Sequence, residues 1–166
     1  MKKVLVFVLV ASLAAISQAA TFNWSVTNIK SGGSNIPKGQ FIAYVFADST
    51  YAYDTAVAAA AAGTLDTSKA LDSSTGTANG KAIVEGAETT LSGEQEMYVI
   101  VFDSSTPNTG NFIKTSKQKM ELTTVGSVTY AFGSQSSNTW TPIPEPTTVA
   151  LLALGLAALG LKRKVA

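Results

Sequence analysis

The chain has 166 residues, no histidine, no cysteine and a formal net charge of +1 at pH 7. The missing side chains exclude Ser-His-Asp and Cys-His catalysis, the common zinc sites and disulfide bonds within the chain. Residues 20–143 contain seven lysines, no arginine and ten acidic side chains. This mildly acidic part therefore has no basic surface for nucleic acid.

The first 19 residues follow the order of a secretory signal peptide. Lys2 and Lys3 precede an apolar stretch at residues 4–16, and the small residues Ser17 and Ala19 follow it. A basic start, a short apolar stretch and a small-residue cleavage site are typical of signal peptides. We therefore predict export through the Sec translocon and cleavage by signal peptidase after Ala19. The alternative, a core helix with a basic start, does not account for the complete pattern.

Residues 20–140 are predicted to form a small, β-rich extracellular domain. Apolar and polar side chains alternate through residues 22–26, as in a strand with one buried face. Two apolar and aromatic runs, residues 40–47 and 96–103, suit strands that are covered on both faces. Six short strands joined by polar loops predict an antiparallel sandwich or a partly open barrel. The weaker strand patterns occupy residues 81–86, 112–124 and 127–132.

One alanine-rich segment, residues 48–63, interrupts the β pattern. Asp48, Ser49 or Thr50 could cap the first turn of a helix, and Gly63 stands where a helix would stop. We predict one short helix here. A loose alanine-rich loop is the alternative, because alanine propensity alone stabilises a short helix poorly.

The domain contains no pattern of residues that indicates a particular reaction. Two pairs of nearby carboxylates, Glu94 with Glu96 and Asp48 with Asp54, could in principle serve glycoside hydrolysis, but nothing marks either as a catalytic pair. A domain of this size also has few residues available to line a deep cleft. We therefore predict no catalytic residues and no enzyme activity.

Two loops rich in oxygen-bearing side chains, residues 72–80 and 103–110, contain the residue types of a calcium loop. Neither has the acidic density of an EF-hand. Aspartate, serine, asparagine and glycine also dominate turns for backbone reasons, so solvated turns are the favoured interpretation. We predict no metal site and no cofactor.

The C-terminal tail combines a proline-rich turn, an uncharged apolar run and a basic end. The run at residues 147–161 spans about 22 Å as a helix, which is short of the ~30 Å hydrocarbon core. Lys162, Arg163 and Lys164 can anchor it by reaching the cytoplasmic interface. We predict a marginal transmembrane helix that suits an intermediate more than a permanent anchor. A plain C-terminal anchor and a buried helix are the alternatives.

Just before this run, Pro144 and Pro146 flank Glu145 and prevent a helix from extending upstream. The sequence IPEPTTVALLALGLAALGLKRK resembles the PEP-CTERM sorting signal of exported surface proteins of Gram-negative bacteria, in which a Pro-Glu-Pro motif, a hydrophobic span and a basic cluster follow in this order. The resemblance makes residues 141–166 the sorting signal. It implies that a membrane-embedded, exosortase-type cysteine protease/transpeptidase recognises the motif, cuts near it, and releases the product or transfers it to the cell surface.

These observations predict an exported, non-enzymatic cell-surface or extracellular-matrix protein that passes through an inner-membrane intermediate. The alternative is an adhesin or glycan-binding module for extracellular polysaccharide. Trp24, Tyr51, Tyr53 and Trp140 could then form stacking platforms. Aromatic side chains more often belong to the core, which favours the first hypothesis.

Overall fold

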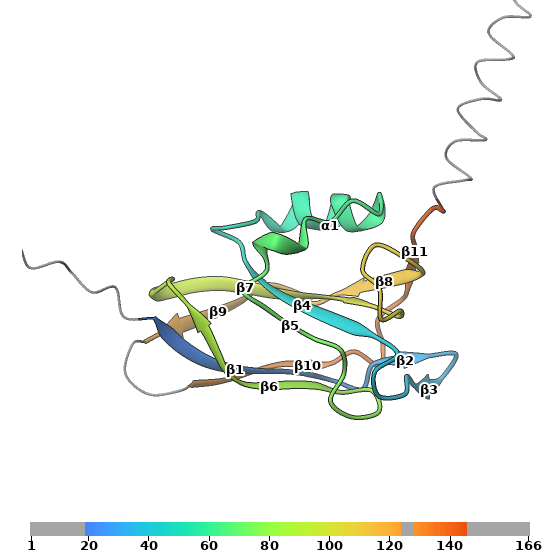
Figure 1. Ribbon diagram of the computed structural model, residues 1–166, viewed down its shortest axis with the longest axis horizontal. Coiled ribbons are helices and arrows are strands. Elements are labelled where there is room, and N and C mark those ends of the chain that lie inside the picture. Colours follow the sequence, from blue (N-terminus) through green and yellow to red (C-terminus); the bar gives the residue numbers. More distant parts are fainter. Residues whose placement is uncertain (1–18, 124–127, 146–166) are drawn as a thin grey trace, which may run out of the picture.

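The computed structural model describes residues 19–123 and 128–145. Helix α1 (Tyr53–Ala61), a large sheet and a small sheet lie in three successive layers (Figure 1). The described part is mainly β, as predicted, and its strands form separate sheets that face each other rather than a closed barrel. A hairpin of β2 (Lys30–Ser31) and β3 (Ser34–Asn35) and a 3-10 turn (Thr67–Lys69) complete it.

The small sheet has β1 (Ala20–Thr27) at its centre, between β6 (Ala82–Thr89) and β10 (Val128–Ser134). Alternate residues of β1 are buried, which confirms the predicted one-sided strand at residues 22–26. The strand pairs are antiparallel, as predicted, except that β1 and β10 are parallel. These strands lie more than a hundred residues apart in sequence, so no hairpin dictates their direction.

The large sheet has the order β11-β8-β7-β4-β5, and β9 also pairs with β7. The predicted strand at residues 112–124 is in fact two strands, β8 and β9, which pair with different parts of the long β7. Thr115 interrupts them and exchanges hydrogen bonds with the backbone of Val99. The bounds are β4 (Ile42–Ala47), β5 (Asp72–Ser74), β7 (Gly93–Phe102), β8 (Asn111–Lys114), β9 (Gln118–Leu122) and β11 (Thr141–Pro142).

Strands β4 and β7 are covered on both faces, as their apolar runs predict. Every residue of β4 and the last six of β7 are buried. On one face, side chains such as Val45 and Val99 pack against the small sheet. On the other face, Phe46 and Tyr98 stack with ring centroids 5.4 Å apart and pack beneath α1. The β4–β7 pair therefore separates two hydrophobic cores.

Helix α1 forms within the predicted alanine-rich segment. The N-cap is Ala52, which has no capping side chain, so the prediction that Asp48, Ser49 or Thr50 is the N-cap residue is wrong. Asp48 Oδ1 still accepts a hydrogen bond of 2.7 Å from the Tyr53 amide, the first amide of the helix. At the other end Gly63 has φ +68°. The amides of Gly63 and Thr64 donate to the carbonyls of Ala60 and Ala59, which is the Schellman arrangement expected of a glycine stop.

Within residues 19–123 and 128–145, no helix has both the length and the apolar character needed to cross a membrane. The predicted transmembrane helix at residues 147–161 lies outside the described residues. The same is true of nearly all of the predicted signal peptide.

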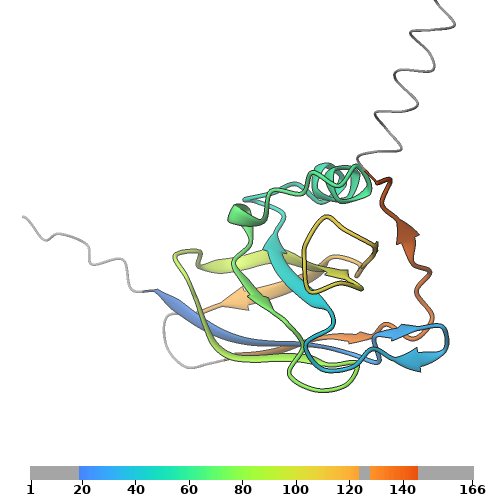
Figure 2. The ribbon, with the colours of Figure 1, turned by 45° about the vertical axis from the view of Figure 1, so that its right-hand side comes forward.

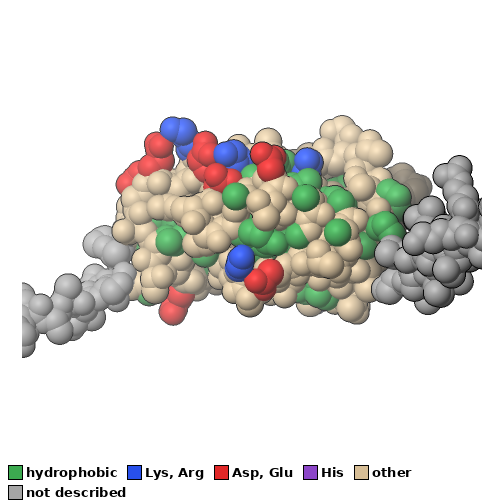
Figure 3. All heavy atoms as spheres, turned by 90° about the horizontal axis from the view of Figure 1, so that it is seen from above, with side chains coloured by type: hydrophobic (Ala, Val, Ile, Leu, Met, Phe, Trp, Pro, Cys, Tyr) green, Lys and Arg blue, Asp and Glu red, His purple; other side chains and the backbone are tan. Residues whose placement is uncertain are grey.

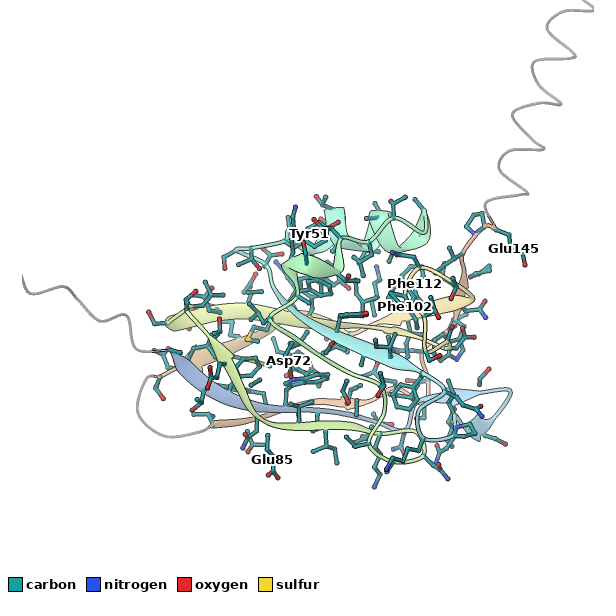
Figure 4. The ribbon with its side chains drawn as sticks, viewed as in Figure 1. Tyr51, Asp72, Glu85, Phe102, Phe112 and Glu145 are labelled. Atoms are coloured by element: carbon teal, nitrogen blue, oxygen red, sulfur yellow. The ribbon has the colours of Figure 1, made fainter. Side chains whose placement is uncertain are left out.

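A partly buried hydrogen bond links the two sheets. Trp24 is completely buried between them, and its Nε1 donates to Asp72 Oδ2 of β5 at 2.7 Å. Figure 4 shows Asp72 between the sheets, whereas Glu85 points outward from the small sheet. The aspartate that the sequence places in a turn-like loop thus satisfies the one polar atom of the largest core side chain.

We expect Asp72→Ala to lower the free energy of unfolding by about 1–3 kcal/mol, because the buried indole N–H would lose its acceptor. Glu85→Ala is the matched control and should change stability by less than about 0.5 kcal/mol. Urea unfolding of both purified variants measures the difference. Equal effects would show that the Trp24–Asp72 bond does not stabilise the fold.

The buried tyrosines beneath α1 should make the stability of the fold sensitive to alkaline pH. Burial raises the pKa of Tyr98, whose hydroxyl donates to the Tyr51 carbonyl at 2.6 Å, and burial also raises the pKa of Tyr44. Above about pH 10 the unfolded chain releases these protons while the folded chain keeps them, so stability falls as the pH rises. Tyr98→Phe should make the decline in unfolding free energy between pH 9 and 11.5 shallower. An unchanged slope would contradict this.

Candidate functional site

The chain leaves the folded domain along the edge of the large sheet. Strand β11 pairs antiparallel with β8, with Thr141 opposite Phe112 and Pro142 opposite Asn111. The next amide, that of Ile143, donates to the Gly110 carbonyl at 2.9 Å. Figure 2 shows this orange segment running along one side of the molecule toward α1. The residues just before the predicted sorting motif are therefore part of the fold.

Ile143 is the last buried residue of the described chain. Its side chain is 8% exposed and belongs to the core cluster beneath α1, together with Phe102 and Phe112. It also lies against the end of the helix, since a Cβ added to Gly63 would be only 2.9 Å from Ile143 Cγ2. Ile143 thus connects the edge strand, the end of α1 and the core.

The loop at residues 103–110, beside Ile143, is held by hydrogen bonds of its side chains. Asn108 Oδ1 accepts from the Leu65 amide at 2.8 Å, and Asn108 Nδ2 donates to the Leu65 carbonyl at 3.0 Å. Asp103 accepts from the Asn111 amide and from Asn111 Nδ2 at 2.7 and 2.6 Å. The carboxylate of this predicted turn therefore holds the loop together. The described residues contain no group of three or more acidic side chains that could hold a metal ion.

Immediately after Ile143 the chain becomes exposed. Pro144 and Glu145 are both exposed, and Glu145 projects from the end of the described chain (Figure 4). Ala19 is exposed one residue before β1, so cleavage after it would not interrupt that strand. Pro146 and the basic residues Lys162, Arg163 and Lys164 lie outside the described residues.

The charged side chains gather mainly at the opposite end of the large sheet, around β7 and β9 (Figure 3). Lys117 Nζ lies 2.6 Å from Glu96 and 3.5 Å from Asp48, and its hydrogen bond to Glu96 raises the pKa of the lysine. Lys119 pairs with Glu94 at 2.8 Å. Two of the carboxylates considered for catalysis, Glu94 and Glu96, are therefore paired with lysines at the surface.

The structure separates the four aromatic residues predicted to form stacking platforms. Trp24 is completely buried and Tyr51 is 7% exposed, so neither can stack on a glycan and that prediction is wrong for them. Lys114 Nζ lies 5.2 Å from the ring centroid of the half-buried Tyr53. Trp140 is half-buried against the other core cluster. These side chains do not form one platform.

The surface hollows of the described part include two near the segments discussed above. One, of about 260 Å³, lies between β8 and residues 137–141, and the other, of about 370 Å³, lies between the β2–β3 region and Asp103. The first has Lys114 as its only charged lining residue and the second has Asp103, which is already bonded to Asn111. Neither hollow brings two ionisable groups together.

Comparison with known proteins gives one match. The family model for the PEP-CTERM protein-sorting motif matches residues 142–164, which confirms the resemblance seen in the sequence. No curated protein and no solved structure matches the chain. The match begins at Pro142, inside β11, so the sorting motif and the fold overlap by two residues, Pro142 and Ile143. The polar and proline-rich composition around these residues gave no sign that they pair with a strand.

We expect Gly63→Ala to destabilise the protein more than Gly32→Ala. Both glycines have positive φ, which costs alanine about 1–2 kcal/mol, but a Cβ meets Ile143 at position 63 and nothing within 4 Å at position 32. The contact should add about 1–3 kcal/mol of overpacking. Thermal unfolding of the two purified variants provides the comparison. Equal losses would show that Ile143 is not packed against the helix end.

Proposed function

We propose that this is a non-enzymatic, exported cell-surface or extracellular-matrix protein whose C-terminal segment is removed by an exosortase-type enzyme. The sorting motif itself indicates export and membrane-associated sorting toward the cell surface. One observation supports the proposal most directly. The folded domain ends at the buried Ile143, and the first two residues of the Pro-Glu-Pro motif follow it in an exposed position.

The processing step needs an accessible peptide bond. Pro144 and Pro146 disfavour helix around Glu145 and keep the backbone extended, which is the form that proteases bind. In the proposed reaction one peptide bond near the motif breaks. The domain-side carbonyl carbon takes either the hydroxyl of water or an acceptor amine, and the downstream segment leaves as a free amine. The product is the β domain with a short C-terminal extension.

The rest of the surface supports a structural role rather than catalysis. The Lys117 and Lys119 pairs occupy three of the acidic groups at the charged end, Asp48, Glu94 and Glu96. Asp72 accepts a hydrogen bond from the buried Trp24, and Asp103 accepts one from the Asn111 amide in a loop. No observation on the exposed surface favours the adhesin alternative, because two of its four aromatic residues are buried. We therefore propose display or matrix formation, with the signal peptide removed after Ala19.

The test is the intact mass of the protein recovered from the membrane, surface and medium fractions of its own bacterium. We expect surface or medium material to end near Pro144–Pro146, and Glu145→Ala to accumulate in the membrane with its tail intact. Glu85→Ala is the control for replacing an exposed glutamate, and it should be processed normally. Wild-type protein that ends at Ala166 and stays in the inner membrane would instead show a permanent anchor.

A further inference from the structure

We propose that β11 and Ile143 are positioning residues of the sorting site: they hold the Pro-Glu-Pro motif at a fixed distance from the folded domain and set the N-terminal limit of cleavage. This inference rests on the proposed function, since it assumes that an exosortase-type enzyme reads the motif. We refer to Thr141, Pro142 and Ile143 as the latch.

The latch is short, but it is fixed at several points. It has two strand pairs with β8, one further hydrogen bond from Ile143 to Gly110, and one side chain inserted in the core. The surroundings of Ile143 are themselves held in place by Asn108 on Leu65 and by Asp103 on Asn111. A residue fixed in this way cannot swing freely, so the direction in which Pro144 leaves the domain is determined by the fold.

The spacing after the latch is small. Only Pro144, Glu145 and Pro146 separate Ile143 from the apolar run that begins at Thr147. Three extended residues reach about 10 Å. While the apolar run is in the membrane, the end of the domain around Ile143 must therefore lie close to the membrane surface and to any enzyme embedded there.

The exit end of the domain suits such an approach. The segments that surround Ile143, residues 58–64, 104–110 and 139–143, contain no charged side chain. Charged groups lose hydration when they are brought against another surface, and this costs free energy unless each is paired. The charged side chains around Lys117 and Glu96 gather at the opposite end of the large sheet (Figure 3).

The latch also limits where cleavage can occur. A protease needs its substrate backbone extended and unpaired, whereas residues 141–143 are engaged with β8 and Gly110. The first peptide bonds outside these interactions follow Ile143. The product should therefore keep Ile143, and its new C-terminus should remain attached to the sandwich.

The test inserts Gly-Ser-Gly-Ser between Ile143 and Pro144 of the full chain and follows loss of the tail by pulse-chase in its own bacterium. The insertion leaves the domain, the motif and the apolar run unchanged. We expect processing about tenfold slower, because the insertion separates the motif from the fold and the enzyme must then position the motif itself. A tenfold change corresponds to the entropy of ordering roughly one residue. The matched control inserts the same four residues between Gly32 and Gly33, an open turn, and should be processed at the wild-type rate.

A second pair of variants tests the side chain. Ile143→Ser should slow processing by a similar factor and yield products that end upstream of position 143, whereas Ile143→Val should restore both the rate and the product mass. A structural role alone would leave the mass of the cleaved product unchanged in Ile143→Ser.

The outcomes separate the two proposals. If Glu145→Ala blocks processing but the insertion after Ile143 is processed at or above the wild-type rate, the latch has no positioning role and the proposed function stands. If Glu145→Ala is processed normally, the proposed function fails, and the positioning role fails with it. A wild-type product that ends before Ile143 would overturn the latch alone.

Discussion

The pairing of β4 with β7 is the interaction on which the rest of the structure depends. Six consecutive pairs, from Ile42 with Phe102 to Ala47 with Met97, place buried side chains on both faces of the large sheet. Each face needs a cover, and the small sheet and α1 supply the two covers. Since the chain has no cysteine, its stability comes from these two cores and from hydrogen bonds such as that of Trp24.

The same pair also determines where the chain leaves the domain. The end of β7 at Phe102 pairs with β8, and the free edge of β8 receives β11. The core beneath α1 extends to this edge and includes Ile143. The exit of the sorting motif is therefore a consequence of how the large sheet and the helix meet, and the charged residues at the Met97 end play no part in it.

Local patterns in the sequence predicted the elements that depend on local physics. Alternation identifies β1, continuous apolar runs identify β4 and β7, and Gly63 marks the end of α1, whereas the start of the helix at Ala52 was not predicted. Contacts between distant segments could not be predicted in this way. The parallel β1–β10 pair, the bond between Trp24 and Asp72, and the pairing of β11 all join residues far apart in sequence, so no turn or periodicity encodes them. The sorting signal could be recognised from the order of its Pro-Glu-Pro motif, apolar run and basic end, but its attachment to the fold could not be predicted.

A sorting signal on an exported domain must satisfy two opposing requirements. It has to stay exposed for the enzyme, yet an unattached end next to an apolar segment would be open to unrelated proteases. A two-residue strand followed by one buried isoleucine meets both requirements, because pairing protects the chain up to Ile143 and the prolines prevent the protected structure from continuing. A longer strand would bury the motif, and no strand would leave the domain loosely attached to its signal. The shortness of β11 therefore suits a boundary between a stable domain and the segment that we propose is removed.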